Sequence, residues 1–290
     1  MKYLILIIVI LMSVMMLYAN DYCIVEVKTG EMLNLPELAK KLQKYDIIFF
    51  GEYHDNETLH YLEKELLPLL ETKKELIISM EMFERDVQSD LDAYVEGWLS
   101  EEEFLQKSRP WNNYLTDYRP IIEYAKAKKL SVIAANIPRP IAGKMARMGD
   151  DFMDALSEED KKWLPAKITN PDDDYKKAFL ATMEDMQSPM MKGDPEWQYK
   201  SQCLKDDTMA ESIVNALEMK PKARIIHFNG DFHSRNFLGT VSRVQTMLPK
   251  KQIAVISPSS REDWKNGTLT DAEKKAGTFI ILIPQQGGEQ

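Results

Sequence analysis

The chain contains 290 residues, of which 44% are hydrophobic and 29% are charged, and its formal net charge is −9 at pH 7. These proportions are typical of an ordinary globular protein, and the length suffices for one sizeable core with an inserted subdomain. The negative charge, without an arginine-rich run or zinc-finger spacing, excludes nucleic-acid binding as the main function.

The N-terminus is typical of a secretory signal. Lys2 precedes an apolar run over residues 4–17, which is shorter than the roughly 20 residues of a membrane-spanning helix. We therefore predict a signal peptide over residues 1–19, with cleavage near residues 19–22. Cleavage just before Cys23 would expose a thiol for lipid attachment, but the preceding residues match the small-residue pattern for lipidation poorly. The sequence leaves a soluble periplasmic chain and an outer-membrane lipoprotein as alternatives.

Strand and helix patterns alternate through the rest of the chain. Short apolar runs predict strands at 24–27, 46–50, 76–80, 131–135, 224–228, 252–257 and 278–283. Amphipathic patterns and capping residues predict helices at 34–44, 56–70, 87–97, 100–108 and 118–129. This alternation indicates an α/β fold with a mostly parallel sheet flanked by helices.

Residues 140–220 carry a helical pattern without a strand signal, and prolines interrupt it. We interpret this segment as a helical insertion or lid within a single α/β domain over residues 23–290.

Ionisable and amide side chains directly follow four of the predicted strands: Glu52, His54, Glu81, Glu84, Asn136, Asp231 and His233. The carboxyl ends of parallel strands lie along one edge of a sheet, and ligands bind in the crevice at that edge. We therefore expect these side chains to meet in one crevice.

Carboxylates beside imidazoles hold a divalent metal or divide acid and base roles near neutral pH. The alternative is a buried polar network that only fixes the strand-to-helix turns. His227, which lies inside a predicted strand, is better explained as a core histidine. The sequence contains neither a Gly-x-Ser-x-Gly nucleophile motif nor a His-Glu-x-x-His zinc motif.

Several motifs occur in an order that resembles a known family. They are residues 51–56 (Gly-Glu-Tyr-His-Asp-Asn) with His60, residues 81–85 with Gln88, Tyr118-Arg119-Pro120 with Ala125, Asn136 with Pro138-Arg139, Gln202 with Asp206, Met209 and Ala210, and residues 229–233. This set, over roughly residues 45–257, resembles the ChaN-like haem-binding lipoproteins, which are similar in fold to erythromycin esterases. One departure is Tyr53, where the resemblance leads us to expect a small polar residue or glutamine.

The resemblance implies an exported haem-binding protein of haem or iron acquisition, with haem at a homodimer interface and an outer-membrane haem receptor as a candidate partner. It also implies a tyrosine on the iron and basic or histidine groups on the propionates. Tyrosinate is a known haem ligand. The candidates are Tyr175, Tyr199 and Tyr53, and we rank Tyr175 first because of its place in the helical segment.

Further haem contacts are expected from His54, His233, Met190, Met191 and Lys192. Methionine adapts to irregular apolar surfaces and contacts aromatic systems favourably. Ordinary helix packing better explains the nearby Met183 and Met186, whereas Met190, Met191 and Lys192 lie in a break between helices and are the better lid candidates.

A hydrolase of the erythromycin-esterase type, with or without a divalent metal, is the competing prediction. It would use Glu52, His54, Glu81 and His233 for water activation. A protein-binding scaffold whose polar crevice is purely structural is a third prediction.

Overall fold

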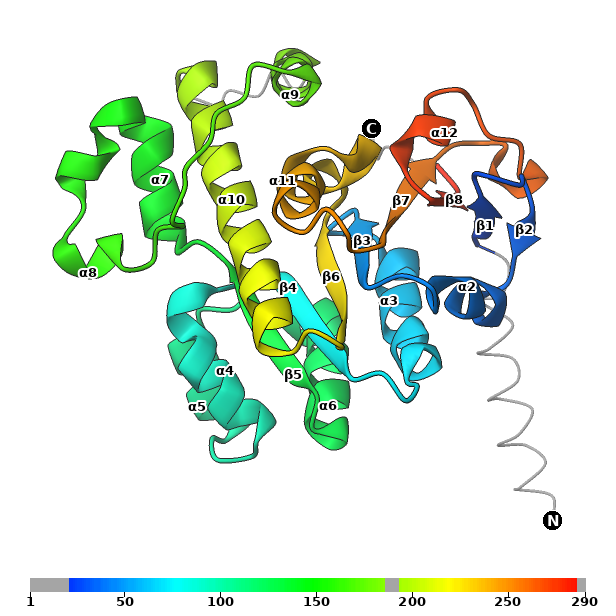
Figure 1. The fold of residues 1–290 in the computed structure, drawn as a ribbon, viewed down its shortest axis with the longest axis horizontal. Coiled ribbons are helices and arrows are strands. Elements are labelled where there is room, and N and C mark those ends of the chain that lie inside the picture. The colour runs from blue at the N-terminus through cyan, green and yellow to red at the C-terminus, as the bar shows by residue number, and fades with distance from the viewer. Residues whose placement is uncertain (1–20, 186–192, 286–290) are drawn as a thin grey trace.

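The computed structural model describes residues 21–185 and 193–285 and has one eight-stranded sheet at its centre (Figure 1). The strands are β1 (Cys23–Glu26), β2 (Met32–Leu33), β3 (Ile47–Glu52), β4 (Leu76–Glu84), β5 (Ser131–Asn136), β6 (Arg224–Gly230), β7 (Ile253–Ser260) and β8 (Phe279–Ile283). Their order across the sheet is β2-β1-β8-β7-β3-β6-β4-β5. Strands β3 to β8 run parallel, whereas β1 and β2 pair antiparallel at one edge. The predicted mostly parallel α/β fold is thus confirmed.

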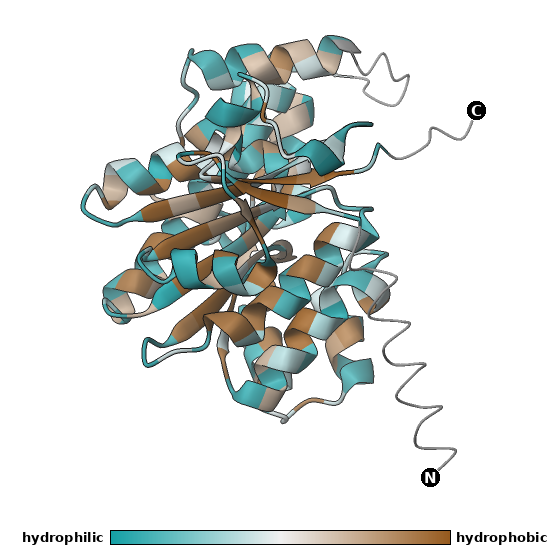
Figure 2. Cartoon of the chain, turned by 90° about the vertical axis from the view of Figure 1, so that its right-hand side faces the viewer, coloured by the Kyte–Doolittle hydropathy of each residue, from teal (hydrophilic) through white to brown (hydrophobic). Residues whose placement is uncertain are grey.

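Alternate residues of the strands enter two separate hydrophobic cores because successive side chains point to opposite faces of a sheet. Ile48 and Phe50 belong to one core, and Ile47 and Phe49 belong to the other. Figure 2 shows the same pattern as hydrophobic strands between helices of mixed polarity. Burial on both faces explains why these strands are continuous apolar runs in the sequence.

Helices cover both faces. On the first face lie α2 (Leu35–Leu42), α3 (Glu57–Leu70) and α6 (Arg119–Lys128), with α4 (Gln88–Val95) and α5 (Glu101–Ser108) beside α6 at the β5 edge. On the second face lie α10 (Pro195–Met219) and α11 (Gly239–Met247). Helix α11 and the short strand β2 are absent from the predicted elements, because neither carries a strong periodic pattern.

Two asparagines cap the amino-terminal ends of α2 and α3, as the sequence predicts. The side chain of Asn34 accepts a hydrogen bond from the backbone N–H of Glu37, and the side chain of Glu37 accepts one from the N–H of Asn34. Asn56 caps α3 by accepting a hydrogen bond from the N–H of Leu59. This second cap lies at the carboxyl end of β3 and therefore fixes how the chain leaves the sheet there.

The segment between β5 and β6 contains no strand in its described residues. It forms α7 (Arg139–Met148), α8 (Glu158–Lys161), α9 (Asp174–Asp185) and α10. Helix α10 packs against α7, α11 and β5, and the first half of this long helix extends beyond the sheet together with α7 and α9 (Figure 1). The segment therefore supplies both a covering helix of the core and a wall above the sheet edge.

None of the helices within the described ranges is long and apolar enough to cross a bilayer. The predicted signal peptide falls on residues 1–19, outside these ranges.

Candidate functional site

A cavity of about 590 Å³ opens at the carboxyl edge of the parallel strands. This volume is in the range of cofactor and small-molecule sites. Residues in the carboxyl-terminal parts of β3, β4 and β5 or just after β3 and β6 line it, as the sequence predicts: Glu52, His54, Glu81, Glu84, Asn136, Asp231 and His233. Helices α7 and α10 add Ala142, Gln202 and Lys205. The expected convergence of distant segments is therefore present.

His233 lies between two buried carboxylates. Its Nδ1 is 2.7 Å from Oδ1 of Asp206, and its Nε2 is 3.2 Å from Oε1 of Glu81. Burial alone would lower the pKa of His233, but the charges of Glu81 and Asp206 outweigh it and raise the pKa to about 10. The same pairing with His233 holds the pKa of the buried Glu81 carboxyl well below its usual value. His233 is therefore an imidazolium at neutral pH and cannot serve as a base there.

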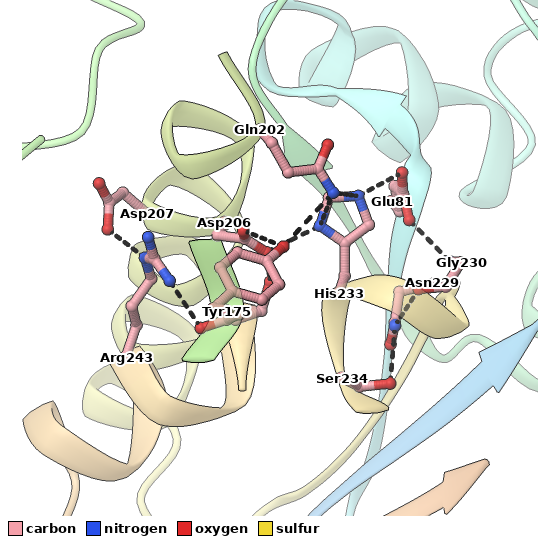
Figure 3. A network of polar contacts seen from close by, with 12 residues as sticks. Glu81, Tyr175, Gln202, Asp206, Asp207, Asn229, Gly230, His233, Ser234 and Arg243 are labelled. Carbon is pink, nitrogen blue, oxygen red and sulfur yellow. Dashed lines mark hydrogen bonds and ion pairs between the residues drawn. The ribbon is translucent and has the colours of Figure 1, made fainter. Parts of the chain in front are cut away.

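The carboxylate of Asp206 accepts hydrogen bonds from three side chains, of which Figure 3 labels those of His233 and Tyr175. Its Oδ1 accepts from Nδ1 of His233 and from the hydroxyl of Thr240, and its Oδ2 accepts from the hydroxyl of Tyr175, each at 2.7 Å. Glu81 is anchored as well, because its Oε2 accepts a hydrogen bond of 2.8 Å from the N–H of Gly230. Both carboxylates consequently hold His233 in one orientation.

His54 forms the second histidine–carboxylate pair. Its Nδ1 lies 2.6 Å from Oε1 of the fully buried Glu52, and its side chain is 42% exposed. Burial would lower the pKa of His54, but the hydrogen bond to Glu52 and the charge of Glu81 raise it above the ordinary value. Because Glu52 occupies Nδ1, the ring directs Nε2 toward Gly230, where an added Cβ would lie 2.8 Å away. His54 is thus the cavity histidine with a ring nitrogen that no described residue holds by a hydrogen bond.

The acidic groups of the cavity are largely neutralised by partners. Arg235 Nη1 is 2.9 Å from Oδ2 of Asp231, and both Arg109 and Arg139 bind the carboxylate of Glu84. Lys205, by contrast, forms no ion pair within the described part of the chain. Its ammonium group is therefore the lining cation without a direct carboxylate partner among the described residues, and it could contact a ligand that carries carboxylates.

The apolar wall includes Trp111, Ile137 and Phe232. The ring of Trp111 meets that of His54 edge-on, at a centroid distance of 4.9 Å. The cavity therefore offers a flat ligand an apolar surface beside the imidazole of His54 and the ammonium group of Lys205.

The three predicted iron ligands lie in different places. Tyr53 lines the cavity, and its hydroxyl donates to the carbonyl of Pro258 at 3.2 Å. Tyr175 and Tyr199 are buried with Cys203 behind Phe232 and do not line the cavity. The hydroxyl of Tyr199 donates to the carbonyl of Pro171 at 2.6 Å, and that of Tyr175 donates to Asp206. Burial and the charge of Asp206 raise the pKa of Tyr175, which opposes formation of a tyrosinate in this arrangement.

Three other predicted haem contacts, Met190, Met191 and Lys192, lie outside the described residues. Sequence reasoning did not select Asp206, Lys205 or Trp111 as site residues. Asp206 and Gln202 are four residues apart and therefore share one face of α10, which was the available signal. Trp111 lies in a loop and has no comparable signal.

His227, expected to be a core histidine, is fully buried in β6. Its Nδ1 is 2.8 Å from the hydroxyl of Ser79, and Nε2 has no hydrogen-bond partner among the described residues. Burial lowers the pKa of His227 to about 3, so the ring is neutral. It takes no part in the cavity.

Comparison with known proteins identifies relatives of this chain. Residues 38–244 match the family described as haem-binding uptake, Tiki superfamily, ChaN. Among solved structures, one of cofacial haem binding to ChaN of Campylobacter jejuni is similar with a TM-score of 0.69 at 16% identity, covering 91% of this chain and 98% of that one. An erythromycin esterase mutant in its open conformation is similar with a TM-score of 0.52 at 12% identity, covering 93% of this chain and 98% of that one.

A search of curated proteins found no match. The structural similarities, at these low identities, support the fold. The family match extends over most of the chain and includes all the residues that line the cavity, from Glu52 to Arg235. On this ground the chain belongs to the ChaN family of haem-binding uptake proteins in the Tiki superfamily.

Proposed function

We propose that this chain is an exported haem-binding protein that takes part in haem or iron acquisition. The observation that carries the proposal is the family match over residues 38–244, which includes the cavity at the sheet edge. ChaN of Campylobacter jejuni, whose fold is similar, is described as binding haem cofacially.

The chemistry of the cavity supports haem as the ligand. Haem is a flat apolar ring with two carboxylates, so its site needs an apolar wall and cations. Trp111, Ile137 and Phe232 supply apolar surface, and Lys205 supplies a cation that forms no direct ion pair with a carboxylate of the described chain. Arg139 and Arg235 line the same cavity and are further candidates for propionate contacts.

A tyrosine remains the proposed iron ligand. Tyr53 already lines the cavity and would give up one hydrogen bond of 3.2 Å, whereas Tyr175 and Tyr199 lie outside the cavity and would give up shorter ones of 2.7 and 2.6 Å. We therefore rank Tyr53 first and Tyr175 second as iron ligands. Among the histidines, His54 is the candidate for an iron ligand, because its Nε2 faces the cavity.

The remaining parts of the proposal concern the assembly and its place in the cell. A flat ligand bound against one wall leaves its second face open, so a second copy of the chain would cover it and haem would promote a homodimer. The signal-like N-terminus supports export to the periplasm or the outer membrane, where an outer-membrane haem receptor would be a partner.

Haemin titration followed in the Soret region tests this proposal. We expect a saturable spectral change, weakened about tenfold in Lys205→Gln because a propionate loses its cation. Lys222→Gln, an exposed lysine before β6 at the opposite edge of the sheet, is the matched control and should bind as the parent does. A titration without a saturable change would end the haem proposal.

The iron ligand is tested by Tyr53→Phe, Tyr175→Phe and Tyr199→Phe in parallel. The variant that loses the iron ligand should shift the haem absorption spectrum, whereas loss of a packing hydroxyl should leave the spectrum unchanged. Unaltered spectra in all three variants would exclude these three tyrosines as the iron ligand and favour His54.

A hydrolase is the second candidate, and the His54–Glu52 pair favours it. Glu52 fixes the ring so that Nε2 is the nitrogen available to take a proton from water, while the His233 imidazolium can stabilise developing negative charge. Hydrolysis of aryl esters and of the lactone of erythromycin, followed by mass spectrometry, tests this candidate. His54→Asn should abolish a true activity, and an unchanged rate would assign the activity to a contaminant.

A further inference from the structure

A second cluster of ionisable residues lies behind the cavity, on the first two turns of α3. It consists of Glu52 at the end of β3 and of His60 and Glu63 in α3, and all three side chains are 6% exposed or less. One ligand atom from each lies within 4.8 Å of the others. The haem proposal does not use His60 or Glu63.

The tautomer of His60 follows from its hydrogen bonds. Its Nε2 lies 3.1 Å from the backbone carbonyl of His54, and a carbonyl oxygen only accepts, so Nε2 carries the proton. With this single proton on the ring, the lone pair of Nδ1 faces Oε2 of Glu63, 3.0 Å away, and Oε2 of Glu52, 3.4 Å away. The two buried carboxylates and Nδ1 thus face one small space, which a divalent cation would fill in place of a proton shared among these groups.

The carboxylates leave oxygen atoms available at this point. Oε1 of Glu52 is already held by Nδ1 of His54 at 2.6 Å and by the hydroxyl of Tyr118 at 2.7 Å. Oε2 of Glu52 and Oε1 of Glu63 are buried and accept no hydrogen bond from the described residues. No lysine or arginine of the described chain pairs with either carboxylate. His54 and Tyr118 thus hold one oxygen of Glu52 in place, while Oε2 of Glu52 and Oε1 of Glu63 remain available to bind a metal ion.

We propose that Glu52, His60 and Glu63 form a binding site for a divalent first-row transition-metal ion such as zinc. Metal-ligating histidines usually donate their other ring N–H to a carbonyl or a carboxylate, as Nε2 of His60 does to the carbonyl of His54, which leaves Nδ1 to bind the metal. Ligands at about 2.0–2.2 Å from a metal are separated by about 3.0–3.5 Å from one another, which agrees with the two distances from Nδ1. One nitrogen and two carboxylate oxygens suit zinc, iron(II) or manganese.

Glu52 connects this site to the cavity, because one of its oxygens faces His60 and the other holds His54. The metal would fix Glu52 and, through it, the ring of His54. The inference stands independently of haem binding, since neither His60 nor Glu63 lines the cavity.

The test uses the full chain, stripped of metal with a chelator and equilibrated with zinc sulfate. We expect one zinc per chain by mass spectrometry of the elements, release of protons on binding, and a higher Tm. Cobalt(II) should give visible d–d absorption. Glu63→Gln and His60→Gln should each lower zinc affinity by about 100-fold or more.

Three controls make the result decisive. Glu57→Gln, an exposed glutamate in the first turn of the same helix, should keep the zinc. Glu63→Gln supplies an amide N–H to its acceptor neighbours, so the variant should fold, which circular dichroism checks. His233→Asn should also keep the zinc. Absence of stoichiometric zinc in the parent chain, or loss of zinc in His233→Asn but not in Glu63→Gln, would overturn the inference.

Discussion

His233 remains charged far above neutral pH because Glu81 and Asp206 hold its two ring nitrogens. Its pKa in the folded chain, about 10, exceeds the ordinary value of about 6.5 expected in the unfolded chain. The stabilisation from this pairing is therefore complete below about pH 6.5 and is lost progressively as the pH rises through about 10.

We predict that the free energy of unfolding, measured in urea, falls by a few kcal/mol between neutral pH and about pH 10.5. In His233→Gln the fall should be much smaller, because the titrating group is absent. Histidine signals in NMR spectra give the direct reading: a ring at position 233 that is neutral at pH 8 would contradict the assignment.

Gly51 in β3 and Gly230 in β6 differ in which atoms an added side chain would contact. A Cβ on Gly51 would lie 2.6 Å from Oδ1 of Asp231, 3.0 Å from its Cα and 3.2 Å from the carbonyl of Ile256. A Cβ on Gly230 would meet the imidazole of His54, a side chain that can move.

We predict that Gly51→Ala lowers the free energy of unfolding by about 1–3 kcal/mol, because the backbone must shift. Gly230→Ala should change stability by less than Gly51→Ala and instead weaken haem binding by displacing His54. Urea unfolding and haemin titration of both variants measure this contrast, and equal losses of stability would argue against it.

At the scale of the elements, one buried arginine joins three helix and loop ends at the amino edge of the sheet. The guanidinium of Arg224, in the first position of β6, donates to the carbonyls of Gln43, Tyr45 and Leu70. The first and last of these lie at the ends of α2 and α3, whose last carbonyls lack partners within the helix.

Arg224→Met should therefore lower the free energy of unfolding by about 2–4 kcal/mol, because buried carbonyls lose their donor. Arg147→Met, at an exposed position near the end of α7, is the control and should change it by less than about 0.5 kcal/mol. A similar loss of unfolding free energy in both variants would mean that the hydrogen bonds of Arg224 do not stabilise the fold.

For the whole molecule, the proposed dimer makes a prediction of its own. We expect haemin to convert a monomer to a species of about twice its mass in analytical ultracentrifugation, since a second copy would cover the open face of the ring. Lys205→Gln should shift this conversion to higher haemin concentration. Haem binding that saturates without any change of mass would separate binding from dimerisation and remove the dimer from the proposal.

The sequence predicted the sheet and the carboxyl-edge site because both depend on local patterns. Apolar runs at residues 47–50 and 224–228 mark strands buried on both faces, and the polar residues that follow them must lie at the same edge of a parallel sheet. Predicted strand ends were short, as at β4, where the ladder continues through Glu81 to Glu84 with a change of register.

Only the tertiary structure decided which side chains complete the site. Gln202 and Lys205 reach the cavity because α10 crosses the sheet edge, Asp206 of the same helix holds His233 from outside the cavity, and Trp111 reaches the cavity from a loop. Tyr175 and Tyr53 are both tyrosines near motifs in the sequence, yet packing turns one hydroxyl to Asp206 and leaves the other beside the cavity. The periodicity of a chain fixes which face a residue occupies, whereas burial and hydrogen-bond partners arise from contacts between segments that are distant in the sequence.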